Sequence, residues 1–164
     1  MTETTKEVDE LFDAWERAWS GRDPTAFEAL CAEDFSYEDP LTPEPLRGAA
    51  GLAAHAKALW AAFPDARLNA TGERLTDGRF ACAPCKLLGT HRGNVGGVTP
   101  SGRFIVVHAL VYAELQGERL LRARAFFDVH GAATELGVLP RPGTVGEKAL
   151  LLLRGFGLRA SSGR

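Results

Sequence analysis

The chain has little that points to export, to a membrane or to nucleic acid. It has three cysteines, an odd number that cannot all pair, and no apolar N-terminal segment behind basic residues. We therefore expect reduced thiols and a cytoplasmic location. Apolar runs such as residues 149–153 are too short to cross a bilayer, so we expect no membrane partner. A net charge of −2 gives no electrostatic reason to expect a nucleic-acid partner.

Motifs for metals and nucleotides are also missing. The histidines form no HxH or HExxH spacing, so we expect no metal site. The glycine-rich segment 89–102 lacks the GxxxxGK[ST] spacing of a phosphate-binding loop, and no βαβ pattern surrounds it. Cys82 and Cys85 lie three positions apart on an expected strand and point to opposite faces, which favours packing over redox chemistry.

What is present is a helical half followed by a strand-rich half. Apolar residues recur at helical spacing over 8–19 and over 52–63, where Pro64 ends the second pattern. Asp23 followed by Pro24 is typical of a helix start and predicts a short helix through Leu30. Residues 66–76, 79–91, 103–115 and 118–128 read as strands. The order predicts an α+β fold with one cavity between helices and sheet.

The strand expected over 104–113 is apolar on both faces apart from His108. An antiparallel strand of this kind should be covered on both sides. The helices can cover one face, and we expect the outer sheet face to meet a second copy of the chain as a homodimer.

Several short motifs occur at spaced positions along the chain. They are 19–23 (WSGRD), 33–35 (EDF), 37–40 (YEDP), 63–65 (FPD), 89–93 (GTHRG), 100–103 (PSGR), 127–128 (FD) and 135–137 (ELG). Together, and in this order, they resemble the SnoaL-like polyketide cyclase family. That family belongs to the nuclear transport factor 2-like superfamily, with ketosteroid isomerases and limonene epoxide hydrolases.

The resemblance implies a cone-shaped α+β barrel, in which N-terminal helices close a curved mixed sheet around an apolar pocket. We therefore expect one SnoaL-like domain over residues 1–140, then a C-terminal helical extension and a frayed tail over 141–164. The resemblance also implies a cofactor-free ring closure on a hydrophobic carbonyl compound, in which an aspartate on the final strand takes a proton. Asp128 occupies the matching place in this sequence.

Alternation along the final strand puts Arg124, Phe126 and Asp128 on one face. We expect that face to be the pocket, with Asp128 as the general base and a pKa raised by burial. Asp39 or His108 would polarise the substrate carbonyl. Asp39 has an equally simple explanation as the cap of the Asp-Pro turn.

Other side chains are expected to bind the substrate. His91 matches a family position that often carries a polar pocket residue, and His55 shares a helix stripe with Leu52 and Leu59. Arg124 and several aromatic residues complete the expected wall, although aromatic residues at such spacings are often core residues. These aromatic residues are Tyr37, Trp15, Trp19, Trp60, Phe63, Phe104 and Phe126.

Three functions remain open at this point. The first is the cyclase or isomerase. The second is an epoxide hydrolase that holds water between Asp39 and Asp128, with Arg124 or Arg122 between them. The third is a non-catalytic, dimeric module that binds a small hydrophobic molecule.

Overall fold

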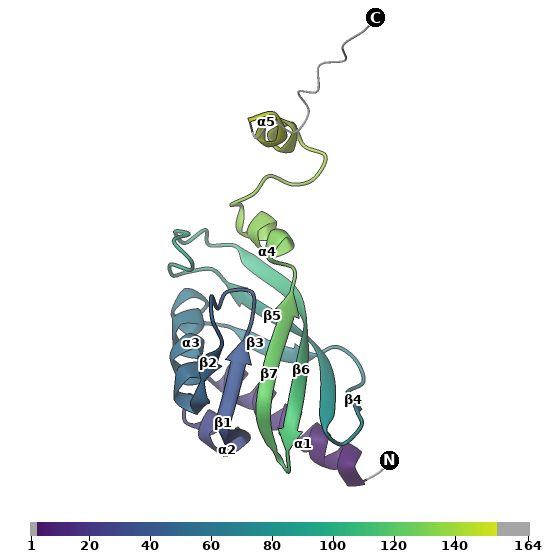
Figure 1. Cartoon of the computed structure of the whole chain (residues 1–164). Helices are drawn as coiled ribbons and strands as arrows, with labels where there is room; N and C mark the ends of the chain where they lie inside the picture. The colour runs from purple at the N-terminus through teal and green to yellow at the C-terminus, as the bar shows by residue number, and fades with distance from the viewer. Residues whose placement is uncertain (1–2, 154–164) are drawn as a thin grey trace, which may run out of the picture.

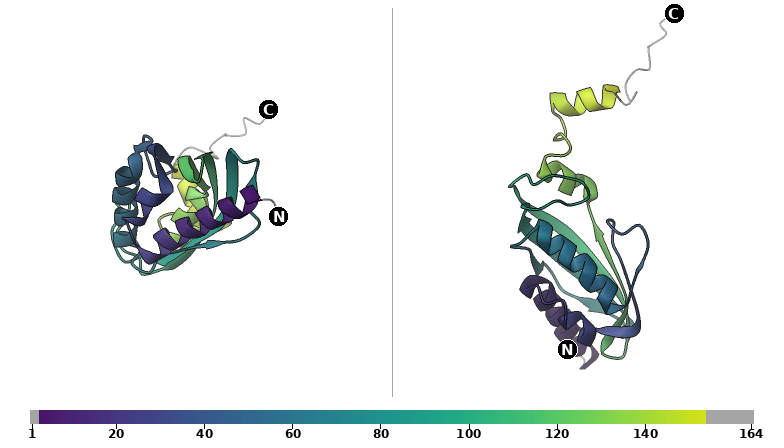
Figure 2. Two further views of the ribbon diagram at one scale, coloured as in Figure 1. Left: turned by 90° about the horizontal axis from the view of Figure 1, so that it is seen from below. Right: turned by 90° about the vertical axis from the view of Figure 1, so that its left-hand side faces the viewer.

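The computed structural model describes residues 3–153. Three helices come first along the chain, α1 (Glu3–Gly21), α2 (Ala26–Leu30) and α3 (Gly48–Ala62). Figure 2 shows α1 and α3 lying across one face of the sheet. The apolar stripe of α1 is buried there, with Phe12 and Trp15 at most 2% exposed. The predicted helical half is therefore present and packs as an amphipathic layer.

All the described strands belong to one seven-stranded sheet of order β2-β1-β7-β6-β5-β3, with β4 paired to β5. Its β1 and β7 run parallel, whereas the other neighbours are antiparallel, so the sheet is mixed. The predicted α+β fold is confirmed. The strands are β1 (Cys31–Glu38), β2 (Leu46–Arg47), β3 (Arg67–Ala70), β4 (Leu75–Thr76), β5 (Phe80–Thr90), β6 (Phe104–Gln116) and β7 (Arg119–Phe127).

The two faces of the long strands differ as alternation requires. On β6 the odd-numbered residues, such as Ile105 and Val107, are buried beneath the helices, whereas Phe104 and His108 are exposed. On β7 the buried residues are Leu120, Ala123 and Ala125. The inner face of the sheet and the helices therefore form one core.

Two features differ from the sequence prediction. The strand expected over 66–76 is split into β3 and β4. A helix not predicted from the sequence, α4 (Val129–Leu136), follows β7 directly. It begins at the residue expected to be the catalytic base, which changes the interpretation of that residue.

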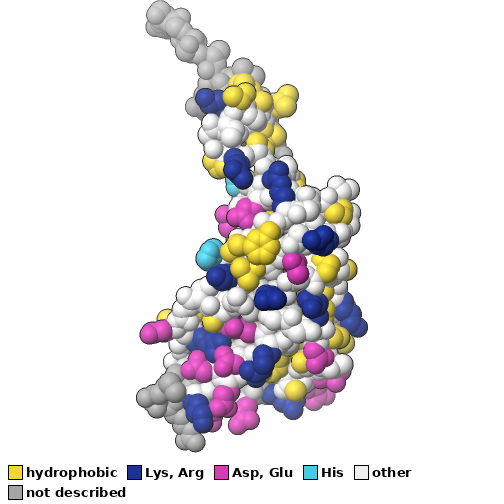
Figure 3. Space-filling view, turned by 180° about the vertical axis from the view of Figure 1, so that it is seen from behind, with side chains coloured by type: hydrophobic (Ala, Val, Ile, Leu, Met, Phe, Trp, Pro, Cys, Tyr) yellow, Lys and Arg dark blue, Asp and Glu magenta, His cyan; other side chains and the backbone are white. Residues whose placement is uncertain are grey.

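The C-terminal extension contains the helix α5 (Val145–Leu153), within the range where a helical extension was expected. Figures 1 and 2 show it beyond α4, away from the sheet and the first three helices. None of its residues is buried, and Figure 3 shows its apolar side chains at the surface. The division near residue 140 stays a prediction, and the end of the expected tail, residues 154–164, lies outside the described residues.

Candidate functional site

An apolar cavity of about 280 Å³ lies between the helices and the inner face of the sheet. Its size is near the lower end for small-molecule sites, which usually measure about 300–1,000 Å³. The walls come from α1, the end of β1, α3, the long strands and α4. The residues that line it include Trp15, Trp19, Tyr37, Asp39, Leu41, Leu59, Phe63, Leu68, Cys85, Leu87, Val95, Val98, Ile105, Val107, Ala125, Phe127, Val129, Ala132, Ala133 and Leu136.

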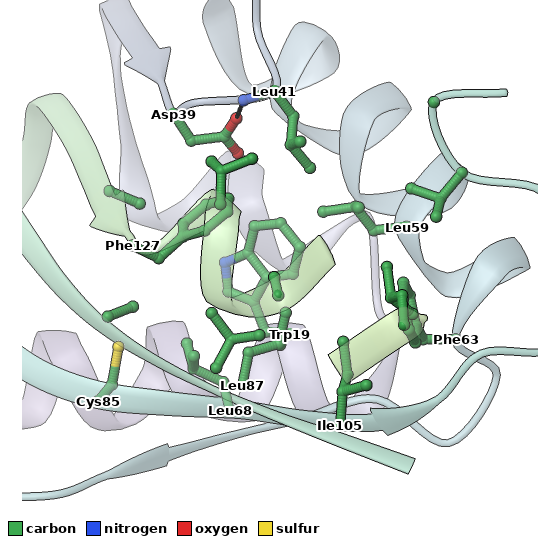
Figure 4. A pocket seen from close by; sticks show the side chains of 18 of the residues that line it. Trp19, Asp39, Leu41, Leu59, Phe63, Leu68, Cys85, Leu87, Ile105 and Phe127 are labelled. Atoms are coloured by element: carbon green, nitrogen blue, oxygen red, sulfur yellow. Dashed lines mark hydrogen bonds between the residues drawn. The ribbon is translucent and has the colours of Figure 1, made fainter. Parts of the chain in front are cut away.

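Asp39 is the one charged side chain among the described residues that line this cavity. It follows β1, and its side chain is only 2% exposed. One carboxylate oxygen accepts hydrogen bonds from the Tyr37 hydroxyl at 3.0 Å and from His55 Nε2 at 2.8 Å. The other accepts the Leu41 backbone N–H at 2.7 Å. Figure 4 shows the carboxylate at the pocket wall with this last bond.

Two opposing effects set the pKa of Asp39. Burial disfavours the charged carboxylate and by itself raises the pKa. The hydrogen bonds and charge of His55, then the Leu41 N–H and the Tyr37 hydroxyl, favour the carboxylate and hold the pKa below its usual range. Burial and the neighbouring Asp39 raise the pKa of Tyr37 well above its usual value, so this hydroxyl stays a donor. The pocket therefore presents an ionised carboxylate at neutral pH.

His55 is the direct partner of this carboxylate. It comes from α3, sixteen residues further along the chain, and its side chain is 14% exposed. Its ring also lies 5.8 Å from the Tyr37 ring between centroids. His55 was expected to bind substrate, but it does not line the cavity; instead its hydrogen bond fixes the orientation of Asp39, which does. No local sequence signal connects the two residues.

Aromatic rings form the wall next to Asp39. The Trp15 ring lies 6.2 Å from Tyr37 and 5.9 Å from Trp19, measured between centroids. Both tryptophans line the cavity, as expected. Trp60 does not line it but packs behind it, and its indole N–H donates to the Trp19 carbonyl at 3.0 Å.

The glycine-rich segment 89–102 supplies part of the pocket wall. Its Arg92 and Gly93 N–H groups both donate to the Ala62 carbonyl at the end of α3. A Cβ at Gly93 would lie 2.2 Å from the Ala61 carbonyl oxygen, so this close approach requires glycine. Anchored in this way, the segment brings Val95 and Val98 to the cavity.

His91 begins that segment and is fully buried, but it does not line the cavity. Its ring stacks on Phe63 at 5.3 Å, and its Nδ1 accepts the Ser101 N–H at 3.1 Å. The prediction that His91 contacts substrate is therefore not supported by its position. It supports Phe63, which does line the pocket as expected.

Asp128 is not in the pocket, and the prediction of a buried base there is wrong in its geometry. Its side chain is exposed and caps α4, with the carboxylate accepting the Gly131 N–H at 2.9 Å. Arg124 and Phe126 share its face, as predicted, but that face is the outer one. Arg124 pairs there with Glu38. The inner face of β7 instead carries Ala125 and Phe127.

Two expected pocket residues on β6 are also on the outer face. Phe104 is 61% exposed, and His108 is exposed opposite Lys86 of β5. Because they lie at even positions on a strand whose odd positions face the core, neither can reach the cavity. Because Asp128 and Arg124 also lie on the outer face, the described residues do not place two carboxylates in the cavity with an arginine between them. No arginine lines the cavity within residues 3–153.

The unpredicted helix α4 closes one end of the pocket. Val129, Ala132, Ala133 and Leu136 line the cavity at positions i, i+3, i+4 and i+7. The helix is attached to β6 because the Glu135 carboxylate accepts the Val106 N–H at 2.9 Å. The sequence did carry signals for this helix: an aspartate at the cap position, the apolar spacing and a glycine, Gly137, after the last apolar residue. In the structure Gly137 adopts the left-handed conformation, at φ +83°, that ends the helix.

The family model described as SnoaL-like polyketide cyclase matches residues 9–136, which contain the whole sheet, most of α1, the helices α2 to α4 and every residue named in the pocket. The chain belongs to this family. No curated protein matches this SnoaL-like chain. Among the described residues, no group of three or more His, Cys, Asp or Glu side chains is placed so that it could hold a metal ion. It also contains no helix long and apolar enough to cross a membrane.

Solved structures share the fold at low sequence identity. TsrD from Streptomyces laurentii is 21% identical with a TM-score of 0.74, over 85% of this chain and 99% of its own. A candidate SnoaL-like polyketide cyclase from Jannaschia sp. CCS1 is 17% identical with a TM-score of 0.75, over 85% and 98%. A hypothetical protein with a ketosteroid isomerase-like fold from Catenulispora acidiphila, in complex with trimethylamine, is 18% identical with a TM-score of 0.69, over 78% and 92%.

Proposed function

We propose that this SnoaL-like protein binds a flat, apolar carbonyl compound and that Asp39 moves a proton on it without a cofactor. The observation that supports this most is the placement of one ionised carboxylate, hydrogen-bonded to His55, in an otherwise apolar cavity. A fixed carboxylate in a water-poor site is an effective general base when the substrate proton lies within reach.

In the proposed step the Asp39 carboxylate takes a proton from a carbon next to a carbonyl. The C–H electron pair moves into the carbonyl to give an enolate, and Asp39 becomes a carboxylic acid. In a cyclase, the enolate carbon then attacks a second carbonyl of the same molecule, and the resulting alkoxide takes the proton back. Because its neighbours depress the pKa of Asp39, it suits acidic protons between two carbonyl groups.

The test is deuterium exchange into 2-acetyl-1-tetralone, a flat 1,3-diketone, followed by NMR in D₂O. We expect the protein to accelerate exchange at the carbon between the carbonyls. Asp39→Asn should remove about 10²–10⁴-fold of that acceleration, the usual contribution of one general base. Asp128→Asn is the matched control and should exchange at the wild-type rate. Equal rates for wild type and Asp39→Asn would refute the role of Asp39.

A second function is favoured by the same depressed pKa. A carboxylate held ionised beside aromatic rings suits a hydrophobic amine, through charge pairing and cation–π contact. The fold relative from Catenulispora acidiphila is in complex with such an amine, trimethylamine. Calorimetry with N,N-dimethyl-1-naphthylmethylamine separates the two functions. Binding that needs Asp39, together with no acceleration of exchange, supports a non-catalytic binding module.

We also propose that the outer sheet face joins two copies of the chain. Large apolar side chains are exposed there on β6 and β7: Phe104, Leu110, Tyr112 and Phe126 are 39–61% exposed. Sedimentation analysis tests this. Phe126→Arg should give a monomer, whereas Leu75→Arg, at an exposed residue of the short β4, should leave the dimer intact. A wild-type monomer at micromolar concentration would contradict the proposal.

A further inference from the structure

The three tryptophans of the chain differ in how their indole N–H groups are used. The Trp60 N–H donates to the Trp19 carbonyl at 3.0 Å. The indole nitrogens of Trp15 and Trp19 are buried and have no hydrogen-bond acceptor among the described residues. Trp15 is 2% exposed and Trp19 is 7% exposed. Buried polar groups are normally paired, so two unpaired donors in one cluster require an explanation.

Contacts with neighbouring aromatic rings do not supply the acceptor that these two indole N–H groups lack. Trp15 meets Trp19 edge-on at 5.9 Å and Phe27 at 5.7 Å between centroids. An N–H directed at an aromatic face is a weak substitute for a bond to oxygen. Both unpaired tryptophans, however, line the ligand cavity. Figure 4 shows the Trp19 ring standing inside the pocket, with its nitrogen toward Phe127 and Cys85 in that view.

The donors and the carboxylate follow one another along a single wall. Trp19 contacts Trp15, Trp15 contacts Tyr37, and the Tyr37 hydroxyl bonds Asp39. The rest of the lining is almost entirely apolar. The wall therefore holds one acceptor, Asp39, at one end and two buried, unpaired donors further along it.

We propose that the indole N–H groups of Trp15 and Trp19 donate hydrogen bonds to a carbonyl oxygen of the ligand. An indole nitrogen only donates, so the ligand group that it binds must be an acceptor. The ligand class is then a flat, apolar ketone whose oxygen lies on the tryptophans and whose acidic C–H reaches Asp39. During proton removal negative charge develops on that oxygen, and fixed donors in a dry site stabilise it.

The inference rests on the proposed function for its catalytic part, but its binding part can be tested separately. The probes are 9-fluorenone and fluorene, which differ by one carbonyl oxygen. In ¹⁵N–¹H spectra of the wild-type protein, fluorenone should move the Trp15 and Trp19 indole N–H signals downfield, and fluorene should not. The Trp60 signal, already hydrogen-bonded, is the internal reference. Equal shifts with both probes would overturn the proposal, and no variant has to fold for this result.

Affinities give the second measurement. We expect wild type to prefer fluorenone over fluorene by roughly tenfold, the usual value of pairing a buried donor. Trp15→Phe and Trp19→Phe should each reduce this ratio, and the double variant should bring it to about one. Trp60→Phe is the control and should keep the ratio, even if both affinities fall. A tenfold preference that survives in the double variant would overturn the proposal.

Asp39→Asn separates this inference from the proposed function. If the two tryptophans bind the carbonyl, Asp39→Asn keeps the preference for fluorenone whether or not it abolishes deuterium exchange. If Asp39 proves to play no part in exchange but the ratio still depends on the tryptophans, the proposed function fails and the carbonyl site stands. If the ratio depends on Asp39 and not on the tryptophans, the carbonyl site fails.

Discussion

Asp39 and Asp128 end two neighbouring parallel strands, yet they have opposite environments. Asp39 follows β1, and Asp128 follows β7, with Glu38 and Arg124 in register between the two strands. Each carboxylate accepts a backbone N–H from a residue just ahead, Leu41 or Gly131. The Asp39 side chain is nevertheless 2% exposed in the pocket, whereas Asp128 is exposed.

Parity along each strand accounts for the difference. Asp39 has the parity of Tyr37, which faces the core, and Asp128 has the parity of Phe126, which is 48% exposed on the outer face. A helix that follows each strand adds to the difference. After β1 and the short β2, α3 brings His55 to Asp39, whereas α4 directly follows β7 and uses Asp128 as its cap. A carboxylate after an apolar strand is thus a candidate base only when its parity and the later helix direct it inward.

The two carboxylates should differ most in how much stability is lost when each is replaced by alanine. Asp39→Ala leaves His55, Tyr37 and the Leu41 N–H without their buried acceptor, so we expect a loss of about 3–5 kcal/mol. Asp128→Ala removes a helix cap and should cost about 1 kcal/mol. Urea unfolding at pH 7 measures both. Similar losses for the two variants would show that the difference in burial has no energetic consequence.

The next largest effect is expected in the pH dependence of the free energy of unfolding, through Asp39. The depressed pKa of Asp39 means that its contribution to folding is fully present above its unfolded pKa, about 4, and is lost as pH falls through the folded pKa. The difference in the free energy of unfolding between wild type and Asp39→Asn should therefore shrink as pH falls below about 4. A difference that stays constant down to pH 2 would contradict the depressed pKa.

A smaller effect is expected in the helix over the pocket. Asp128→Ala should increase amide hydrogen exchange in α4 by about fivefold, because loss of the cap favours local opening by about 1 kcal/mol. Exchange in β1 should not change. Uniform acceleration over both elements would indicate global destabilisation instead of a local role.

The smallest effect should come from Asp128→Asn. Asparagine caps helices about as well as aspartate, so the free energy of unfolding should stay within about 0.5 kcal/mol of wild type. A large loss of unfolding free energy in this variant would mean that the charge of Asp128 itself stabilises the fold, so that Asp128 would not act as a helix cap alone.

Much of the fold was predictable from the sequence because its signals are local and repeated. The apolar stripe of α1, Pro64 after α3 and the alternation on β6 each report one element through its own residues. The aromatic wall was predicted only in part: Trp15, Trp19, Tyr37 and Phe63 line the pocket, whereas Trp60, Phe104 and Phe126 do not. The helix α4 could also have been predicted, because the Asp128 cap and Gly137 bracket its apolar residues.

The site itself was less predictable, because its chemistry depends on contacts between distant residues. The sequence placed Arg124, Phe126 and Asp128 on one face but could not say which face meets the helices. It could not pair Asp39 with His55, or show that two indole N–H groups stay without acceptors. Sequence by itself determined the elements and their faces, since short-range sterics and periodicity set both. Only tertiary structure decided which face became the interior and which carboxylate it enclosed, because that choice depends on packing the helices against one side of the sheet.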